Sequence, residues 1–340
     1  ADGDRSLVAT VADREGAVPI DVYSSTRRAP FYLYWSPDSR QVSFLANAPD
    51  GIALHLAPAD GSADSRILQT GQPFYWQWAQ DSRQLLIHTG DAGREARLAF
   101  IDTAGQTLQA DLAMPGFFQA PGIAPSGRFV SFAIVGRDQF HVILQSTGDG
   151  ARVAVPHKGV AAMSWSPVAD QLAFISPEAD LPTFMGPLRL IDAETGEVWR
   201  LASEAVVSFF WSPDGRSIAY LSRDDGGNPQ AGRGAGRAKA RPAERPQDHP
   251  PLLLKLSVVD VASGQRRLLA TFQPTDLFIT QFIPFFDQYA LSHQLWSPAS
   301  DALVLPMVDS GGAEGIYVVT TADGHRQRIA SGSMAFWSPR

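Results

Sequence analysis

Short apolar runs alternate with polar turn residues along the chain, and this alternation predicts β-strands. The pattern is clearest at residues 209–222. There the aromatic run Phe209–Trp211 is followed by Ser-Pro-Asp-Gly at 212–215 and then by the apolar run 218–221. Proline presets φ for a turn, aspartate bonds back to the main chain, and glycine tolerates positive φ. The stretch therefore predicts a β-hairpin.

The same frame recurs at nearly constant intervals. In each copy an apolar anchor, usually tryptophan, precedes a turn related to Ser-Pro-Asp-Gly-Arg and, in all but the last copy, a second apolar run. The anchors are Trp35, Trp78, Ile123, Trp165, Trp211, Trp296 and Trp337. Up to Trp211 they stand 42 to 46 residues apart, and intervals of 85 and 41 follow. A period in the low forties with about four strands per repeat is typical of a β-propeller blade.

This repeat resembles the TolB-like, WD-type propeller repeats common in bacterial proteins, over nearly the whole chain except residues around 223–250. The resemblance implies an all-β fold of four-stranded antiparallel blades. Seven anchors predict seven blades, with six as the alternative if the N-terminal strand pairs differently. Residues 1–9 and 337–340 read as two halves of one repeat, so we expect the terminal segments to pair and close a single domain spanning residues 1–340.

Two insertions account for the long interval. Residues 223–251 are rich in Gly, Ala, Arg and Pro, contain little to bury, and predict a flexible loop. Residues 271–293 are aromatic, so this loop is expected to pack, either as a cover over the channel mouth or as a surface for a partner. When the four strands of a blade are lettered A to D in chain order, with the anchor at the end of strand A, both insertions fall on the face that carries the B–C and D–A loops. This face lies opposite the regular turns, and function is expected there.

Residues that recur at the same position of successive repeats are expected to maintain the fold, whereas residues that vary between repeats are candidates for function. The anchors Trp35, Trp78, Trp165, Trp211, Trp296 and Trp337 are in phase with the repeat, and we expect them to pack between blades. Residues near the innermost strands that differ between blades are expected to ring the channel entrance and bind a ligand or partner. These candidates are Arg28, Tyr32, Gln72, Tyr75, Phe118, Gln119, His157, Phe285, Phe286, Asp287, Tyr289 and His293.

Composition narrows the possible functions. The net charge of −7 makes nucleic acid an unsuitable partner. Cysteine is absent, which removes thiol catalysis and thiolate metal sites. No apolar run reaches the length of about 18 residues that spans a bilayer. A phosphate-binding loop and a GxSxG nucleophile motif are both missing, so the sequence predicts no catalytic residues.

The histidines do not stand in metal-binding spacings. Some propeller lyases collect histidines and a glutamine from separate blades, and Gln119, His157 and His293 are the set to test for a metal. No metal or cofactor is expected.

We expect a monomeric, non-enzymatic scaffold that binds a protein or peptide. The alternative is a small-molecule or carbohydrate site at the channel mouth, including a metal-dependent lyase or hydrolase. An extracytoplasmic location is implied by the resemblance alone.

Overall fold

The computed structural model describes residues 7–11, 19–49, 51–90, 96–108, 112–113, 119–135, 140–179, 183–224 and 252–338. The chain forms two compact units. The first contains residues 1–184, 189–200 and 287–292, and the second contains residues 185–188, 201–286 and 293–340. None of the helices in the described part of the chain has the length and apolar character needed to span a membrane.

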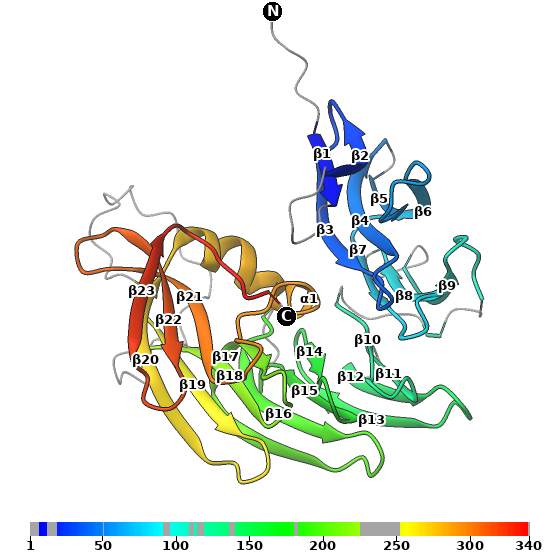
Figure 1. Cartoon of the computed structure of the whole chain (residues 1–340). Helices are drawn as coiled ribbons and strands as arrows, with labels where there is room; N and C mark the ends of the chain where they lie inside the picture. Colours follow the sequence, from blue (N-terminus) through cyan, green and yellow to red (C-terminus); the bar gives the residue numbers. More distant parts are fainter. Residues whose placement is uncertain are drawn as a thin grey trace, which may run out of the picture. The chain divides into compact units, whose positions relative to one another are not determined.

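In the first unit, antiparallel sheets are built from strands that follow one another in chain order (Figure 1). Strands β3–β6 and β10–β13 form four-stranded sheets, as the repeat predicts, β7–β9 form a three-stranded sheet, and β1 pairs with β2 and β14 with β15. The strands are β1 (Leu7–Val11), β2 (Ile20–Ser25), β3 (Pro30–Trp35), β4 (Gln41–Ala48), β5 (Gly51–Pro58), β6 (Arg66–Gly71), β7 (Phe74–Trp78), β8 (Gln84–Thr89), β9 (Arg97–Asp102), β10 (Gly122–Ile123), β11 (Phe129–Val135), β12 (Phe140–Ser146), β13 (Arg152–His157), β14 (Ala162–Trp165) and β15 (Gln171–Ile175).

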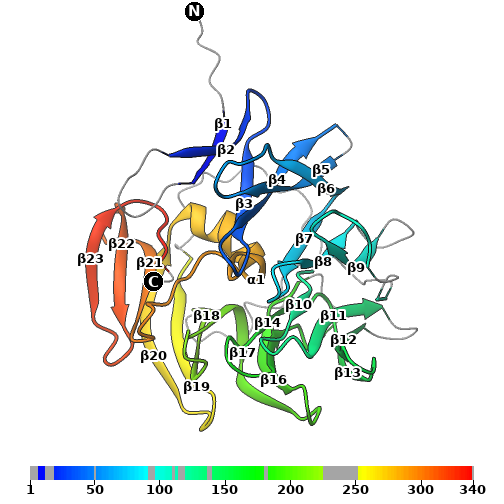
Figure 2. The same cartoon turned by 45° about the vertical axis from the view of Figure 1, so that its right-hand side comes forward.

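The second unit continues the antiparallel pattern. The chain passes between the units within β16 (Gly186–Asp192) and β17 (Val198–Trp211). From the end of β17 to β23, each strand pairs with the next one in the chain (Figure 2). The remaining strands are β18 (Ser217–Arg223), β19 (Leu254–Asp260), β20 (Arg266–Pro274), β21 (Ala302–Val308), β22 (Glu314–Thr320) and β23 (Arg326–Ser331).

The recurring turn has the conformation that its sequence predicts. Glycine at its fourth position, four residues after the anchor, has φ of 72° at Gly127 and 69° at Gly215. Where serine replaces this glycine, at Ser39, Ser82 and Ser300, φ is still positive, between 57° and 60°. In these five copies the position adopts the left-handed conformation, which side chains other than glycine adopt at a cost of about 1–2 kcal/mol. Ala169, at the same position of the Trp165 copy, does not have a positive φ.

These turns also bond to the turns of neighbouring repeats. The Asp38 amide donates to Ser82 Oγ at 3.0 Å between the first and second copies, and the Asp214 amide donates to Ser300 Oγ at 3.2 Å between the fifth and sixth copies. A variant of this bond joins Ser126 Oγ to Asp170 Oδ2 at 2.7 Å. The polar residues of the repeat thus hold adjacent sheets in register.

The anchor tryptophans are not equally buried. Trp78 and Trp296 are 6% and 2% exposed, and their indole N–H groups donate to Ser43 Oγ and the Phe210 carbonyl. Trp35, by contrast, is 50% exposed. Trp165, Trp211 and Trp337 are partly buried. The expectation that every anchor packs between blades is therefore too uniform, because the pattern of the repeat does not encode how much of each ring its neighbours cover.

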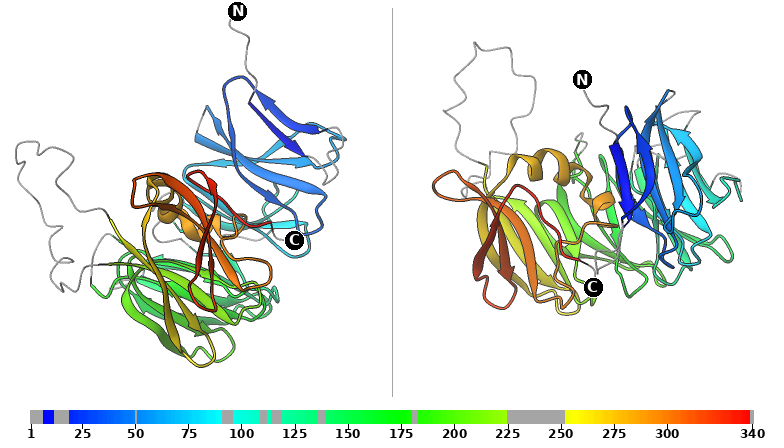
Figure 3. Two further views of the ribbon diagram at one scale, coloured as in Figure 1. Left: turned by 60° about the vertical axis from the view of Figure 1, so that its left-hand side comes forward. Right: turned by 45° about the horizontal axis from the view of Figure 1, so that its top comes forward.

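The aromatic segment 271–293 is largely helical. Its first residues belong to β20, and three short helical elements follow: η2 (Phe278–Phe282), η3 (Ile283–Phe285) and α1 (Phe286–Tyr289), drawn in gold between β20 and β21 (Figure 3). Phe278, Phe282 and Phe286 are buried, and the rings of Phe278 and Phe282 stack at 5.2 Å. These phenylalanine side chains therefore pack in the interior instead of forming an exposed aromatic surface.

Two expectations about the architecture fall outside the described residues. Positions 225–251 cover nearly all of the predicted flexible insertion, and residues 1–6 and 339–340 contain most of the terminal segments expected to pair. Closure by the chain ends and the number of blades stay predictions.

Candidate ligand-binding site

A tyrosine–aspartate cluster, defined as Tyr32, Tyr34, Tyr75, Asp287 and Tyr289, lies in the first unit. Tyr32 and Tyr34 come from β3, Tyr75 from β7, and Asp287 and Tyr289 from α1. The rings of Tyr32 and Tyr289 meet edge to face at 4.8 Å. Four of these residues were predicted from the sequence as ligand-binding candidates, although more than 200 residues separate Tyr75 from Asp287.

Tyr32 has an uncommon backbone conformation. Its φ is +50°, and the pairing of β3 with β4 shifts register between Phe31 and Tyr34. Bulky residues adopt positive φ at a cost on the order of 1–3 kcal/mol, and such residues concentrate at functional sites. Tyr32 therefore lies at an irregularity of the strand, beside the regularly paired Tyr34.

Tyr34 connects β3 to α1. It is 5% exposed, and its hydroxyl donates to the Gln288 carbonyl at 2.8 Å. Tyr75 is equally buried. Tyr32 and Tyr289 are only partly buried, so they form the accessible side of the cluster.

Burial dominates the electrostatics of the cluster. Desolvation raises the pKa of Asp287 to about 7, against the opposing effect of the Gln288 amide, which donates to its carboxylate at 3.0 Å. Burial also raises the pKa of Tyr32, Tyr34 and Tyr75, and the nearby Asp287 carboxylate raises them further. The cluster thus offers neutral phenol groups and a carboxyl group that exchanges its proton near neutral pH.

Gln119 and His157 line a separate small cavity in the first unit. His157 is 6% exposed, its ring stacks on Phe140 at 5.7 Å, and its Nε2 atom has no hydrogen-bond partner in the described part of the chain. Burial lowers the pKa of His157 to about 4, so the ring is neutral at physiological pH. Gln119 Nε2 donates to the Ala133 carbonyl at 2.7 Å. The cavity volume of about 10 Å³ has room for roughly one water molecule.

The other candidates are dispersed. Arg28 is exposed in the loop before β3, and Gln72 is exposed before β7. Phe285 is 39% exposed in the second unit, whereas Phe286 is 1% exposed and packs against Phe209 at 5.2 Å. His293 packs edge-on against Phe336 at 4.4 Å, and burial lowers the pKa of its ring. Phe118 lies outside the described residues.

The set considered for a metal is divided between the two units, and its assembly stays a prediction. Gln119 and His157 belong to the first unit and His293 to the second. Among the residues with defined positions, three or more histidine, aspartate or glutamate side chains do not gather anywhere in a metal-binding group.

Sequence reasoning missed Tyr34. Its spacing of two from Tyr32 on a predicted strand places both residues on one face, which was an available signal. Tyr34 was not selected because it immediately precedes an anchor tryptophan, and residues at that position were expected to pack with the anchor in the core.

Comparison with known proteins identifies the fold of the chain but not its family. No family model matches the chain, nor does any curated protein. Among solved structures, oligogalacturonate lyase from Vibrio parahaemolyticus matches with a TM-score of 0.61 at 12% identity, over 97% of this chain and 86% of that one. The β-propeller domain of Cps50 (Swd1) from Myceliophteria thermophila matches with a TM-score of 0.50 at 14% identity, over 90% of each chain. TolB from Acinetobacter baumannii matches with a TM-score of 0.46 at 16% identity, over 76% of this chain and 58% of that one.

The fold is that of a β-propeller. The sequence-based prediction of a TolB-like, WD-type propeller is confirmed at the level of fold. Because identities of 12–16% carry no more than the fold, the ligand of this propeller has to be argued from its own residues.

Proposed function

We propose that this propeller is a non-enzymatic binding module that recognises a peptide segment of a protein partner at the tyrosine–aspartate cluster. The observation that carries the proposal is Tyr32, held at positive φ with its ring against Tyr289 and its hydroxyl near the Asp287 carboxyl. Strain of this kind persists where a side chain has a use. Tyrosine supplies a large apolar ring and a hydrogen-bonding hydroxyl at low entropic cost, which suits protein recognition.

Exposed apolar side chains on the same elements favour a peptide over a small polar ligand. Leu33, next to Tyr32 in the stretch of β3 where the register shifts, is 40% exposed, and Leu291, just after α1, is 41% exposed. Apolar groups beside a polar cluster are a typical composition for a protein interface. The buried Phe286 is assigned to packing rather than to binding.

A carbohydrate ligand is the second candidate, because the oligogalacturonate lyase matches over most of its length and aromatic rings with a carboxyl group also suit sugars. The charge of the cluster argues against a uronate. Its ionisable acid is Asp287, whereas anionic sugars are bound through arginine and lysine. A neutral oligosaccharide is the form of this alternative that fits.

The test begins with selection of peptides from a displayed library on the immobilised protein, followed by anisotropy titration of the best binder. Tyr289→Ala is expected to weaken binding roughly tenfold or more, as truncation of a central aromatic contact does. Tyr317→Phe is the control, since Tyr317 lies on β22 in the second unit. Failure to select any peptide, together with binding of neutral oligosaccharides on a glycan array, would refute the peptide proposal.

The proposal extends to architecture and location. We infer a monomeric ring of seven blades completed by the terminal segments, and an extracytoplasmic location, both on the strength of the repeat and its resemblance. Light scattering gives the mass, electron microscopy gives the blade count, and fractionation of the source cells gives the compartment. A dimeric mass would overturn the monomer, a count of six would overturn the seven blades, and recovery from the cytoplasmic fraction would overturn the extracytoplasmic location.

A further inference from the structure

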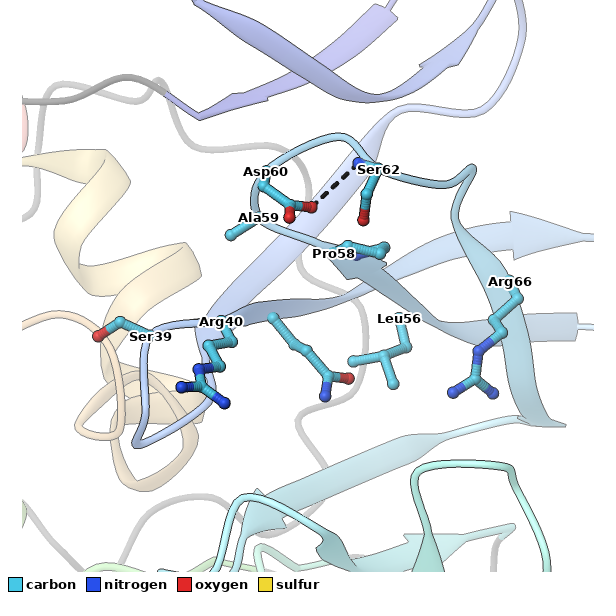
Figure 4. A pocket seen from close by; sticks show the side chains of 9 residues that line it. Ser39, Arg40, Leu56, Pro58, Ala59, Asp60, Ser62 and Arg66 are labelled. Carbon is cyan, nitrogen blue, oxygen red and sulfur yellow. Dashed lines mark hydrogen bonds between the residues drawn. The ribbon is translucent and has the colours of Figure 1, made fainter.

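A second hollow in the first unit lies at the turns of the β3–β6 sheet and has a volume of about 570 Å³. This is within the range of about 300–1,000 Å³ for small-molecule sites. Arg40 follows the repeated turn, Arg66 begins β6, and Leu56 lies on β5. Figure 4 shows both guanidinium groups pointing to the same side, with Leu56 between them. The hollow is thus lined by two guanidinium groups and, between them, by the apolar side chain of Leu56.

One acidic side chain also lines the hollow. The Asp60 carboxylate accepts the Ser62 amide at 3.0 Å, and hydrogen bonds with Ser62 lower its pKa, so it is ionised at neutral pH. Figure 4 shows Asp60 and Ser62 on the far side of Pro58 from the two guanidinium groups. The charge of Asp60 is therefore engaged in its own turn and does not pair with Arg40.

Another repeat shows what the partners of such an arginine are. Arg128 occupies the same position of its turn as Arg40. It forms ion pairs with Asp170, at 2.8 Å, and with Glu194, both from the next repeat. Two carboxylates therefore compensate the charge of Arg128.

The corresponding positions next to Arg40 carry no acid. The position of Asp170 is taken by Arg83, and the backbone fixes this correspondence. Thr103 donates its amide to the Arg83 carbonyl at 3.0 Å, just as Ala193 donates to the Asp170 carbonyl at 3.0 Å.

The position of Glu194 is likewise taken by Ala104, the residue after Thr103. Among the described residues, Arg40 takes part in no ion pair, and Arg66 donates only to the neutral carbonyl of Thr103. The acid closest to Arg40 in sequence is Asp38, whose carboxylate accepts the Ser36 hydroxyl and the Arg40 amide within its own turn. Unlike Arg128, Arg40 therefore has no acid facing it from the next repeat in the part of the chain with defined positions.

We propose that the hollow binds a small organic anion whose phosphate or carboxylate group lies between Arg40 and Arg66. Guanidinium groups bind both kinds of oxyanion through paired, charge-assisted hydrogen bonds. The ligand takes the role that Asp170 and Glu194 have around Arg128, and Leu56 contacts its carbon skeleton. The site is separate from the tyrosine–aspartate cluster and does not depend on the proposed peptide binding.

Isothermal titration of the full chain at low salt tests the site with glucose 6-phosphate, citrate and inorganic phosphate, and with glucose as the uncharged control. We expect saturable binding of glucose 6-phosphate or citrate, none of glucose, and weakening by added salt. The organic anion that binds better identifies the phosphate ester or the carboxylate as the natural group. Arg40→Gln is expected to weaken binding roughly tenfold or more. Arg216→Gln, at the same position of another repeat, should leave it unchanged.

A second variant keeps both arginines and supplies the missing acids. Arg83→Asp with Ala104→Glu copies the surroundings of Arg128, so it should reduce anion binding at least as strongly as Arg40→Gln while the melting temperature is kept or raised. Retained folding in this variant separates loss of the site from loss of the fold. The proposal is overturned if no organic anion binds saturably, or if Arg40→Gln and the acid-restored variant bind like the wild type.

Discussion

Replacing Asp287 by asparagine should make the stability of the first unit less dependent on pH. Burial raises the pKa of this carboxyl from 3.8 to about 7. A carboxyl with a raised pKa binds more protons in the folded state, so its stabilising effect is present at low pH and is lost as pH rises toward 7. Each pKa unit corresponds to about 1.4 kcal/mol. Between about pH 5 and pH 8, roughly two units are crossed, which corresponds to a loss of about 2–3 kcal/mol.

Urea unfolding followed by tryptophan fluorescence measures this loss. The wild type should lose about 2–3 kcal/mol more than Asp287→Asn between the two pH values, because asparagine keeps the shape without the charge. Asp149→Asn is the control. Asp149 is exposed, and its hydrogen bond with Ser146 lowers its pKa, so it titrates below this window. Equal pH dependence of the wild type and Asp287→Asn would show that the carboxyl is not desolvated, and the reasoning would fail.

Two further predictions concern the repeat. Ser39→Gly should stabilise the protein by about 1 kcal/mol in urea unfolding, because glycine removes the cost of positive φ, whereas Gly127→Ala, whose Cβ meets nothing within 4 Å, should destabilise it by about 1–2 kcal/mol. Opposite signs would mean that the turn relaxes out of the left-handed region. Trp296→Ala should cost about 3–5 kcal/mol and Trp35→Ala much less, since one ring is buried and the other half exposed. Equal losses of stability in the same assay would contradict this.

The repeat predicted the sheets and turns well because both depend on local sequence. The alternation of apolar runs located β17, its turn and β18, and the Asp-Gly of that turn matches its positive φ at Gly215. It could not predict the helical turns at 278–289, because an aromatic run with one proline has no clear helical or strand period. Nor could it predict the exposure of Trp35, which depends on neighbours distant in sequence.

The candidate site was predicted in part. Excluding residues in phase with the repeat selected Tyr32, Tyr75 and Tyr289, which the structure brings into one cluster. Their role in binding stays a prediction. The same rule set Arg40 aside, because it stands in phase with Arg128. What distinguishes Arg40 is its surroundings, which become visible only when the neighbouring sheet is placed beside it.

The hydrogen bonds between turns of successive repeats bear on how a repeat protein gains new repeats by gene duplication. The aspartate amide and the serine hydroxyl that meet between Asp38 and Ser82 occupy adjacent positions of the same six-residue frame. A duplicated gene segment therefore carries both halves of the junction, and a new copy joins its neighbours without further substitutions. Selection then acts on copies that already pack against their neighbours. Where the residue that contacts a repeat position is substituted in the neighbouring copy, that position becomes available for another role, such as binding a ligand.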